Sequence, residues 1–280
     1  MNVTLPQNSK IGIKEKLLYF LIIFICIVSI GMVIYNQFFE GKTVTTIGNL
    51  AGKSEDDYNN LKANFDAIFT NKLETDYDKS NIQLKDETKD IVYTSTQGKR
   101  ASTNDYDIEV YIPYINIDND TIKEYNEEIQ EFKEKVSNIL ETKNKNTIYT
   151  VEYGAYIEDD ILSLIIKSNL KEGTSAQRVI VKTYNYNLKT NKEVSFKDIL
   201  SQKEVTEEYA QNRINDDIKI EQKKAEDLIS LGLNIYKRNV DDDIYKIKNI
   251  KEFYVHSGSI YIVFAYGNDA RTSEMDVVIF

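Results

Sequence analysis

The sequence predicts an α+β domain preceded by a single transmembrane helix. Residues 17–35 form an uncharged, mostly apolar run, which is typical of a membrane span. From residue 91 onward, short β-rich runs broken by turn residues indicate antiparallel strands, and longer segments with apolar residues every three or four positions indicate helices. At 280 residues, 41% hydrophobic and 29% charged, the chain is large enough to bury a sizeable core.

The apolar run is long enough to cross a bilayer. Its nineteen residues span about 28 Å as a helix, close to the hydrocarbon core of about 30 Å. We therefore predict a transmembrane helix over residues 17–39, with the lipid bilayer as its partner.

Three other interpretations of this run fit less well. A cleaved signal peptide would be followed by small residues, whereas residues 36–39 are Asn, Gln, Phe and Phe. A lipoprotein signal would place a small residue before Cys26, and Ile25 stands there. A buried helix of a soluble domain rarely stays uncharged for so long. Because Cys26 is the one cysteine of the chain, the outer part has no internal disulfide.

Charge around the run sets its predicted orientation. Lys10, Lys14 and Lys16 crowd the N-terminal flank, and positive flanks stay in the cytoplasm. Residues 1–16 are then a cytoplasmic stub, and the chain from residue 40 onward lies outside the cell membrane.

Residues 40–90 are predicted to form a juxtamembrane connector that contains an amphipathic helix. Ser54 and Asp57 form a capping-box pattern at the start of this helix. Its apolar stripe consists of Tyr58, Leu61, Phe65, Ile68 and Phe69. The sequence leaves open whether this helix packs on the outer domain or stands as a stalk. The polar residues 74–89 show no clear period and indicate a linker or long loop.

Residues 91–280 are predicted to form the extracytoplasmic α+β domain, with an antiparallel sheet and packed helices. The predicted strands span residues 91–94, 106–117, 147–153, 161–170, 177–188, 250–256, 259–266 and 275–280. Thr121 and Glu124 suggest a capping box for a helix whose apolar residues are Ile122, Tyr125, Ile129, Phe132, Val136 and Ile139. A polar helix is predicted over 203–228. Short turns favour an antiparallel meander over alternating βαβ units, and Pro113 indicates an edge strand or a bend.

Composition excludes several functions. With 35 basic and 45 acidic residues the net charge is −10, and no basic cluster offsets it, so we expect no nucleic-acid partner. Zinc sites of the usual kind need several His or Cys ligands, and the chain has one of each. We therefore predict no metal site and no cofactor.

Catalytic signals are weak as well. His256, the sole histidine, sits beside a predicted hairpin turn, and no Gly-x-Ser-x-Gly nucleophile motif occurs. Acidic clusters at 158–160, 216–217 and 241–243 leave open a Ca²⁺ site or a glycosidase pair. Because all three resemble turns or solvated helix faces, we predict no catalytic residue.

Tyrosines are the candidate binding residues. Tyr184 and Tyr186 share one face of a predicted strand, as do Tyr149 and Tyr153. Aromatic faces stack on sugars or form protein interfaces, so Tyr184 and Tyr186 are the predicted ligand-binding residues. The alternative is that these rings are half-buried sheet residues next to a core.

Four segments carry a family resemblance. They are Tyr106 to Ile115, Asn126 to Ile129, Thr183 to Leu200 and Tyr254 to Tyr266. Residues 91–280 resemble the extracytoplasmic domain of the Gram-positive anti-sigma-V factor, a lysozyme receptor, and the accessory domains of membrane-anchored peptidoglycan deacetylases. The resemblance implies the scaffold and an envelope location. The sixteen-residue stub is short for holding a sigma factor, and one histidine cannot supply a deacetylase metal motif.

These observations favour a membrane-anchored, non-enzymatic binding or sensing protein of the bacterial cell envelope. Its expected ligand is peptidoglycan, as cell-wall glycan, or an envelope protein. Two alternatives stay open: a carboxylate-dependent peptidoglycan hydrolase and a structural subunit of an envelope complex.

Overall fold

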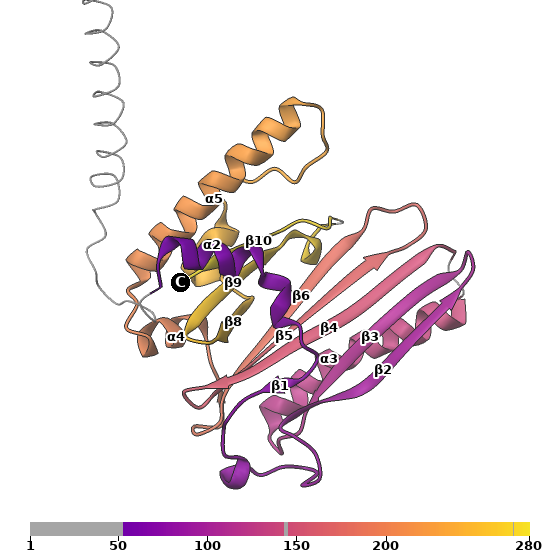
Figure 1. Cartoon of the computed structure of the whole chain (residues 1–280), viewed down its shortest axis with the longest axis vertical. Helices are drawn as coiled ribbons and strands as arrows, with labels where there is room; N and C mark the ends of the chain where they lie inside the picture. The colour runs from indigo at the N-terminus through magenta and orange to yellow at the C-terminus, as the bar shows by residue number, and fades with distance from the viewer. Residues whose placement is uncertain (1–52, 143–144, 271) are drawn as a thin grey trace, which may run out of the picture. The chain divides into compact units, whose positions relative to one another are not determined.

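The computed structural model describes residues 53–142, 145–270 and 272–280, which belong to one compact unit (Figure 1). The predicted cytoplasmic stub and transmembrane helix lie outside these residues. Among the residues described, none of the helices combines the length and the apolar character that a bilayer crossing requires.

The larger of two sheets runs diagonally through the unit and has the order β2-β3-β4-β5-β6-β7. Its strands are β2 (Val92–Ser102), β3 (Tyr106–Ile115), β4 (Thr147–Glu158), β5 (Ile161–Lys171), β6 (Arg178–Asn187) and β7 (Lys192–Glu193). A short β1 (Leu73–Glu74) pairs with β4 in parallel. The β4-β5-β6 meander is antiparallel as predicted, so the α+β class with antiparallel-rich sheets is confirmed. The β3-β4 pair, however, is parallel, because a helix connects the two strands.

That connecting helix, α3 (Asp120–Thr142), lies against one face of the large sheet, behind it in Figure 1. Its buried residues follow the predicted spacing, and they are Ile122, Tyr125, Ile129, Phe132 and Ile139. The predicted capping box at Thr121 is wrong. The helix begins at Asp120, two residues earlier than that cap implies, and the Asn119 side chain accepts a hydrogen bond from the Thr121 backbone N–H at 2.9 Å.

The other sheet packs on the opposite face of the large one and has the order β10-β9-β8. Its strands are β8 (Phe253–His256), β9 (Ser259–Ala265) and β10 (Met275–Ile279), where the predicted final hairpin and last strand were placed. The outer face of this small sheet is covered by α4 (Phe196–Gln202) and α5 (Glu207–Ser230). The predicted helix over 203–228 corresponds to α5, which begins after the Thr206 cap, and the short α4 that precedes it is capped by Ser195.

The amphipathic helix of the connector packs on the domain and does not stand as a stalk. The Ser54–Asp57 capping box is present at the start of α2 (Glu55–Ala63). A 3-10 helix, η2 (Phe65–Ile68), follows, and its two buried end residues join the core between the sheets. Residues 53–90 therefore belong to the same compact unit as the strands that follow them.

Pro113 sits where a missing N–H is tolerated. The β3 residues that pair with β4 are 106–110, so Pro113 lies beyond that pairing. On its other side the register shifts between Thr94 and Thr96 of β2. The prediction of an edge or a bend is confirmed.

Candidate functional site

The tyrosines predicted to bind ligand lie in the core under α3. Tyr184 and Tyr186 are 5% and 1% exposed. The Tyr184 ring lies 4.9 Å from that of Tyr125, and its hydroxyl donates to Glu128 at 3.3 Å. The Tyr186 hydroxyl donates to Asn191 at 3.3 Å. The two rings share one face as predicted, but that face is the covered one, so they do not form the exposed aromatic surface that ligand stacking needs.

The acidic clusters are held by structural contacts. Glu158 and Asp159 accept hydrogen bonds from Lys203 at 2.6 and 2.7 Å, and Asp160 accepts one from Tyr77 at 3.0 Å. Within the described ranges, no set of three or more His, Cys, Asp or Glu side chains is arranged to hold a metal ion. The contacts of the 158–160 cluster therefore stabilise its turn and join it to Lys203 at the end of α4.

His256 has a packing role. Its ring stacks on Tyr156 with 4.4 Å between ring centroids. Burial lowers the pKa of the imidazole, which favours its neutral form. Its Nδ1 atom is buried without a hydrogen-bond partner among the described residues, so no carboxylate orients the ring for base catalysis.

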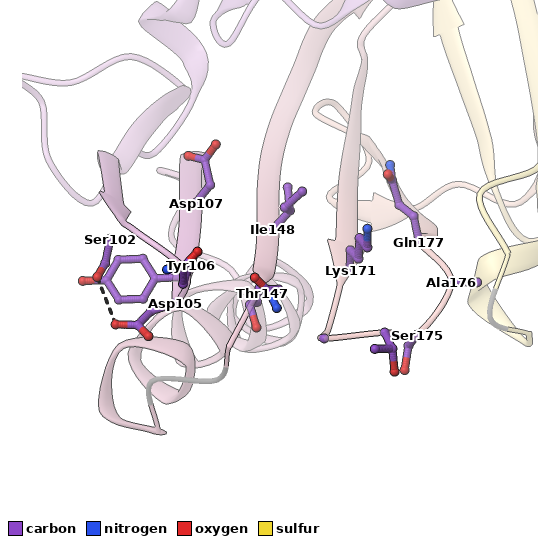
Figure 2. Close-up of a pocket in the computed structure, with 14 residues that line it drawn as sticks. Ser102, Asp105, Tyr106, Asp107, Thr147, Ile148, Lys171, Ser175, Ala176 and Gln177 are labelled. Atoms are coloured by element: carbon purple, nitrogen blue, oxygen red, sulfur yellow. Dashed lines mark hydrogen bonds between the residues drawn. The ribbon is translucent and has the colours of Figure 1, made fainter.

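A wide opening of about 710 Å³ lies at the ends of the long strands; we call it the strand-end hollow (Figure 2). Ser102 and Asp105 are hydrogen bonded at 3.0 Å on one side of it. Figure 2 shows Asp107 and Ser175 pointing in opposite directions. The polar groups of this hollow do not converge on one ligand position.

A second opening, of about 490 Å³, lies beside β6 and β9; we call it the edge-strand cleft. Its apolar lining includes Ile250, Ile262 and Phe264, and its charged lining residues are Lys182, Lys251, Glu252, Asp243 and Asp269. The half-buried ring of Tyr236 also lines it. This size falls in the range of about 300–1,000 Å³ of ligand pockets, and an apolar lining with few polar groups is their usual character.

The outer edge of β6, which borders the cleft, is closed by side chains. Asn268 accepts a hydrogen bond from the Val181 N–H at 2.9 Å and donates to the Val181 carbonyl at 3.0 Å. The Glu252 carboxylate accepts from the Thr183 N–H at 2.7 Å. Because these backbone groups are satisfied, an extended peptide has no free edge to join here.

Glu252 has an unusual environment. Burial raises the pKa of its carboxyl group, although nearby Lys182 and the hydrogen bonds from Thr183 favour the charged form. A carboxyl group with a raised pKa inside a cleft is a feature of functional sites and also of structural networks.

A buried charged network fixes the wall of the cleft. Arg238 donates to both carboxylate oxygens of Asp276, at 2.8 and 3.0 Å, and to Glu274 at 2.8 Å. The Tyr266 hydroxyl donates to Asp276 in a short hydrogen bond. The Tyr245 hydroxyl lies 2.7 Å from that of Tyr266. We call these residues the Arg238 network.

The Arg238 network positions Tyr236. The Tyr236 ring stacks on Tyr266 with 3.9 Å between centroids, and its backbone N–H donates to Glu274 at 2.7 Å. The ring is thus held in place before any ligand arrives, which reduces the entropy lost on binding.

Sequence reasoning missed this cleft. Its residues come from β6, from the irregular segment 236–252 and from β9, which only the folded chain brings together. One signal was present: Tyr236 and Arg238 lie in a segment without helical or strand period, and such loops often carry function.

Comparison with known proteins adds two distant structural likenesses. No family model matches the chain, and no curated protein matches its sequence. A DUF3298 family protein from Pseudomonas aeruginosa PAO1 aligns with 8% identity and a TM-score of 0.39, over 67% of this chain and 85% of that one. A DUF3298 family member from Bacteroides fragilis aligns with 11% identity and a TM-score of 0.38, over 68% and 89%. Likenesses at this level carry no inference about function, and the resemblance to anti-sigma-V domains stays a prediction.

Proposed function

We propose that this chain is a single-pass membrane protein of the bacterial cell envelope whose outer domain binds a ligand without catalysis. The uncharged run at residues 17–35 and the lysines before it support the membrane placement. The edge-strand cleft supports the binding role, and it replaces Tyr184 and Tyr186 as the proposed site.

The choice of ligand rests on one observation. The fixed ring of Tyr236 lines the same cleft as two exposed lysines, Lys182 and Lys251. Within the described ranges, neither Lys182 nor Lys251 forms a salt bridge within 4 Å, although both lie near enough to the Glu252 carboxylate to favour its charged form. An aromatic face suits the apolar side of a sugar ring, and an ammonium group suits a carboxylate. Cell-wall glycan offers both, because its sugars carry carboxylate-bearing substituents. We therefore favour glycan over a protein ligand.

Retention on purified peptidoglycan tests this role. Tyr236→Ala removes the stacking surface, and a loss of about 0.5–1.5 kcal/mol corresponds to roughly 2- to 13-fold weaker binding. Replacing both Lys182 and Lys251 by Gln weakens binding further and reduces its dependence on salt.

Tyr106→Ala is the matched control, because this tyrosine lines the strand-end hollow. Unchanged retention of a folded Tyr236→Ala protein, or an equal loss in the Tyr106→Ala control, would contradict the assignment of the cleft.

The membrane placement has its own test. A protease added to intact protoplasts is expected to digest the outer domain, and the chain is expected in the membrane fraction of broken cells. A protected domain, or a chain in the soluble fraction, would refute this placement.

A hydrolase is the second candidate, and Glu252 is the observation that favours it. A general acid in glycoside hydrolysis needs a raised pKa, and Glu252 lines the cleft together with Asp243 and Asp269. Its hydrogen bonds from Thr183 favour a structural role instead. A clearing band on a peptidoglycan zymogram that Glu252→Gln abolishes would replace binding by hydrolysis.

A further inference from the structure

An exposed apolar group lies at the C-terminal end of α5, which extends away from both sheets (Figure 1). We call it the α5 tip, and it consists of Leu228, Ile229, Leu231 and Leu233. These side chains are 37%, 38%, 78% and 51% exposed. Single exposed apolar residues are ordinary on soluble proteins, but four within six positions form a patch that indicates an interaction.

The backbone holds the α5 tip in a defined shape. The Leu233 N–H donates to the Leu228 carbonyl at 3.2 Å, and the Gly232 N–H donates to the Ile229 carbonyl at 2.9 Å. With Gly232 at φ +86°, this is a Schellman motif. The motif commonly brings the residues at positions 228 and 233 into contact, which accounts for those two leucines. It does not account for Leu231, which is the most exposed of the four.

We propose that the α5 tip inserts among lipids at the outer surface of the bilayer. This inference rests on the proposed membrane placement. A protruding end with Leu and Ile side chains fits the boundary between lipid headgroups and acyl chains, where apolar side chains are buried.

Charge near the α5 tip indicates that insertion is driven by apolar burial. Lys223 and Lys224 are offset by Glu226 and Asp227 in the last two turns of the helix. The whole chain carries a net charge of −10, which disfavours attraction to anionic lipids. Binding of the tip should therefore persist at high salt.

The segment between the predicted membrane helix and the outer domain is long enough to let the α5 tip reach the bilayer. Thirteen residues, 40–52, separate the predicted membrane helix from Lys53, and they span at most about 45 Å when extended. Next to Lys53, Glu55 pairs with Arg213 near the start of α5. Eighteen residues of helix and turn separate Arg213 from Leu231, which corresponds to about 27 Å. The tip and the connector can therefore reach one bilayer surface together.

Site-specific fluorescence on the full chain tests the inference. In a Cys26→Ser background, Leu231→Cys is labelled with a polarity-sensitive dye, and the protein is reconstituted in phosphatidylethanolamine and phosphatidylglycerol vesicles. Ile148→Cys is the matched control, because Ile148 is also an exposed apolar residue, 41% exposed, and lines the strand-end hollow instead of the α5 tip. We expect a blue shift and loss of emission with nitroxide-bearing lipids at position 231, in low and high salt, and neither change at position 148.

Any other result of this experiment contradicts either the lipid insertion of the tip or the membrane placement of the chain. A blue shift at position 231 that nitroxide lipids do not quench would mean that protein covers the tip, either a second copy or a partner. Equal behaviour at both positions would also refute lipid insertion. A chain that fails to enter vesicles refutes the membrane placement and this inference together, whereas a chain that enters them with an unquenched tip refutes this inference alone.

Discussion

The two faces of the large sheet are built differently. The face under α3 is closed by apolar and tyrosine side chains. The opposite face also packs apolar side chains on the small sheet, among them Val181 and Val263. Along its β6 edge, however, polar groups join distant segments: Thr183 contacts Glu252 and Val181 contacts Asn268, which lie 69 and 87 residues apart. We call these the closed face and the polar face, and the edge-strand cleft lies beside the polar face. In this molecule a candidate site arises at a sheet edge where polar contacts border the apolar packing between the layers.

Breaking the Arg238 network should produce the largest effect. Asp276→Ala removes the two-point partner of Arg238, whose side chain is 8% exposed, and leaves this buried charge with Glu274 as its one remaining carboxylate partner among the described residues. We expect a loss of about 3–5 kcal/mol in the free energy of unfolding, measured by denaturant titration, and a loss of cleft binding.

Two control variants separate the loss of the Arg238 network from a general loss of stability. Replacing the pair together, as Arg238→Met with Asp276→Leu, should recover part of the stability, because both buried charges of the pair are removed and the Glu274 carboxylate that loses Arg238 is 24% exposed. Ile129→Ala under α3 should cost about 2–5 kcal/mol yet leave ligand retention by the folded protein unchanged. An Asp276→Ala variant as stable as the parent protein would show that the Arg238 network does not stabilise the fold around the cleft.

Adding one methyl group beside the cleft, by Gly267→Ala, should have the next largest effect on stability. A Cβ atom at Gly267 would lie 2.0 Å from the Val179 carbonyl oxygen, so Gly267→Ala must displace β6 from the segment after β9. We expect a destabilisation of about 1–3 kcal/mol or more, read from the thermal midpoint. Gly98→Ala on β2 is the matched control, because nothing lies within 4 Å of its added Cβ. Equal effects of the two substitutions would argue that the contact with β6 is loose.

The smallest predicted effect is a pH dependence from Glu252. Its pKa in the folded state is raised above the ordinary value of 4.5, so the folded protein binds more protons between these two values. Its favourable contribution to stability is therefore complete below about pH 4.5 and is lost as pH rises through the raised pKa. Glu252→Gln should remove this slope from the pH profile of unfolding. A slope that persists in the variant would assign it to another group.

The sequence predicts the closed face well and the polar face poorly, for a physical reason. Ile122, Ile129 and Ile139 repeat with the helical period because one apolar stripe must face the sheet, so α3 is visible in the sequence. The same-face position of Tyr184 and Tyr186 also follows from strand geometry. Which face α3 covers does not follow from it, so the sequence did not show that both rings are buried.

The cleft has no such periodic signal. Arg238, Asp276 and Tyr236 lie on segments whose meeting depends on how the small sheet docks, and no local pattern encodes that. Turn chemistry was more informative: the Ser54–Asp57 capping box is present. The start of the predicted 203–228 helix was placed too early, because the Thr206 cap lies within a polar stretch that gives no clear boundary.

Hydrogen exchange with soluble peptidoglycan fragments tests the central claim most directly, because it compares the two faces in one experiment. The account predicts that saturating fragments slow exchange in residues 236–252 and 262–270, which line the edge-strand cleft, and leave α3 unchanged. Protection at the strand-end hollow or along α3 instead, or no protection at saturation, would contradict the assignment of the cleft as the ligand-binding site.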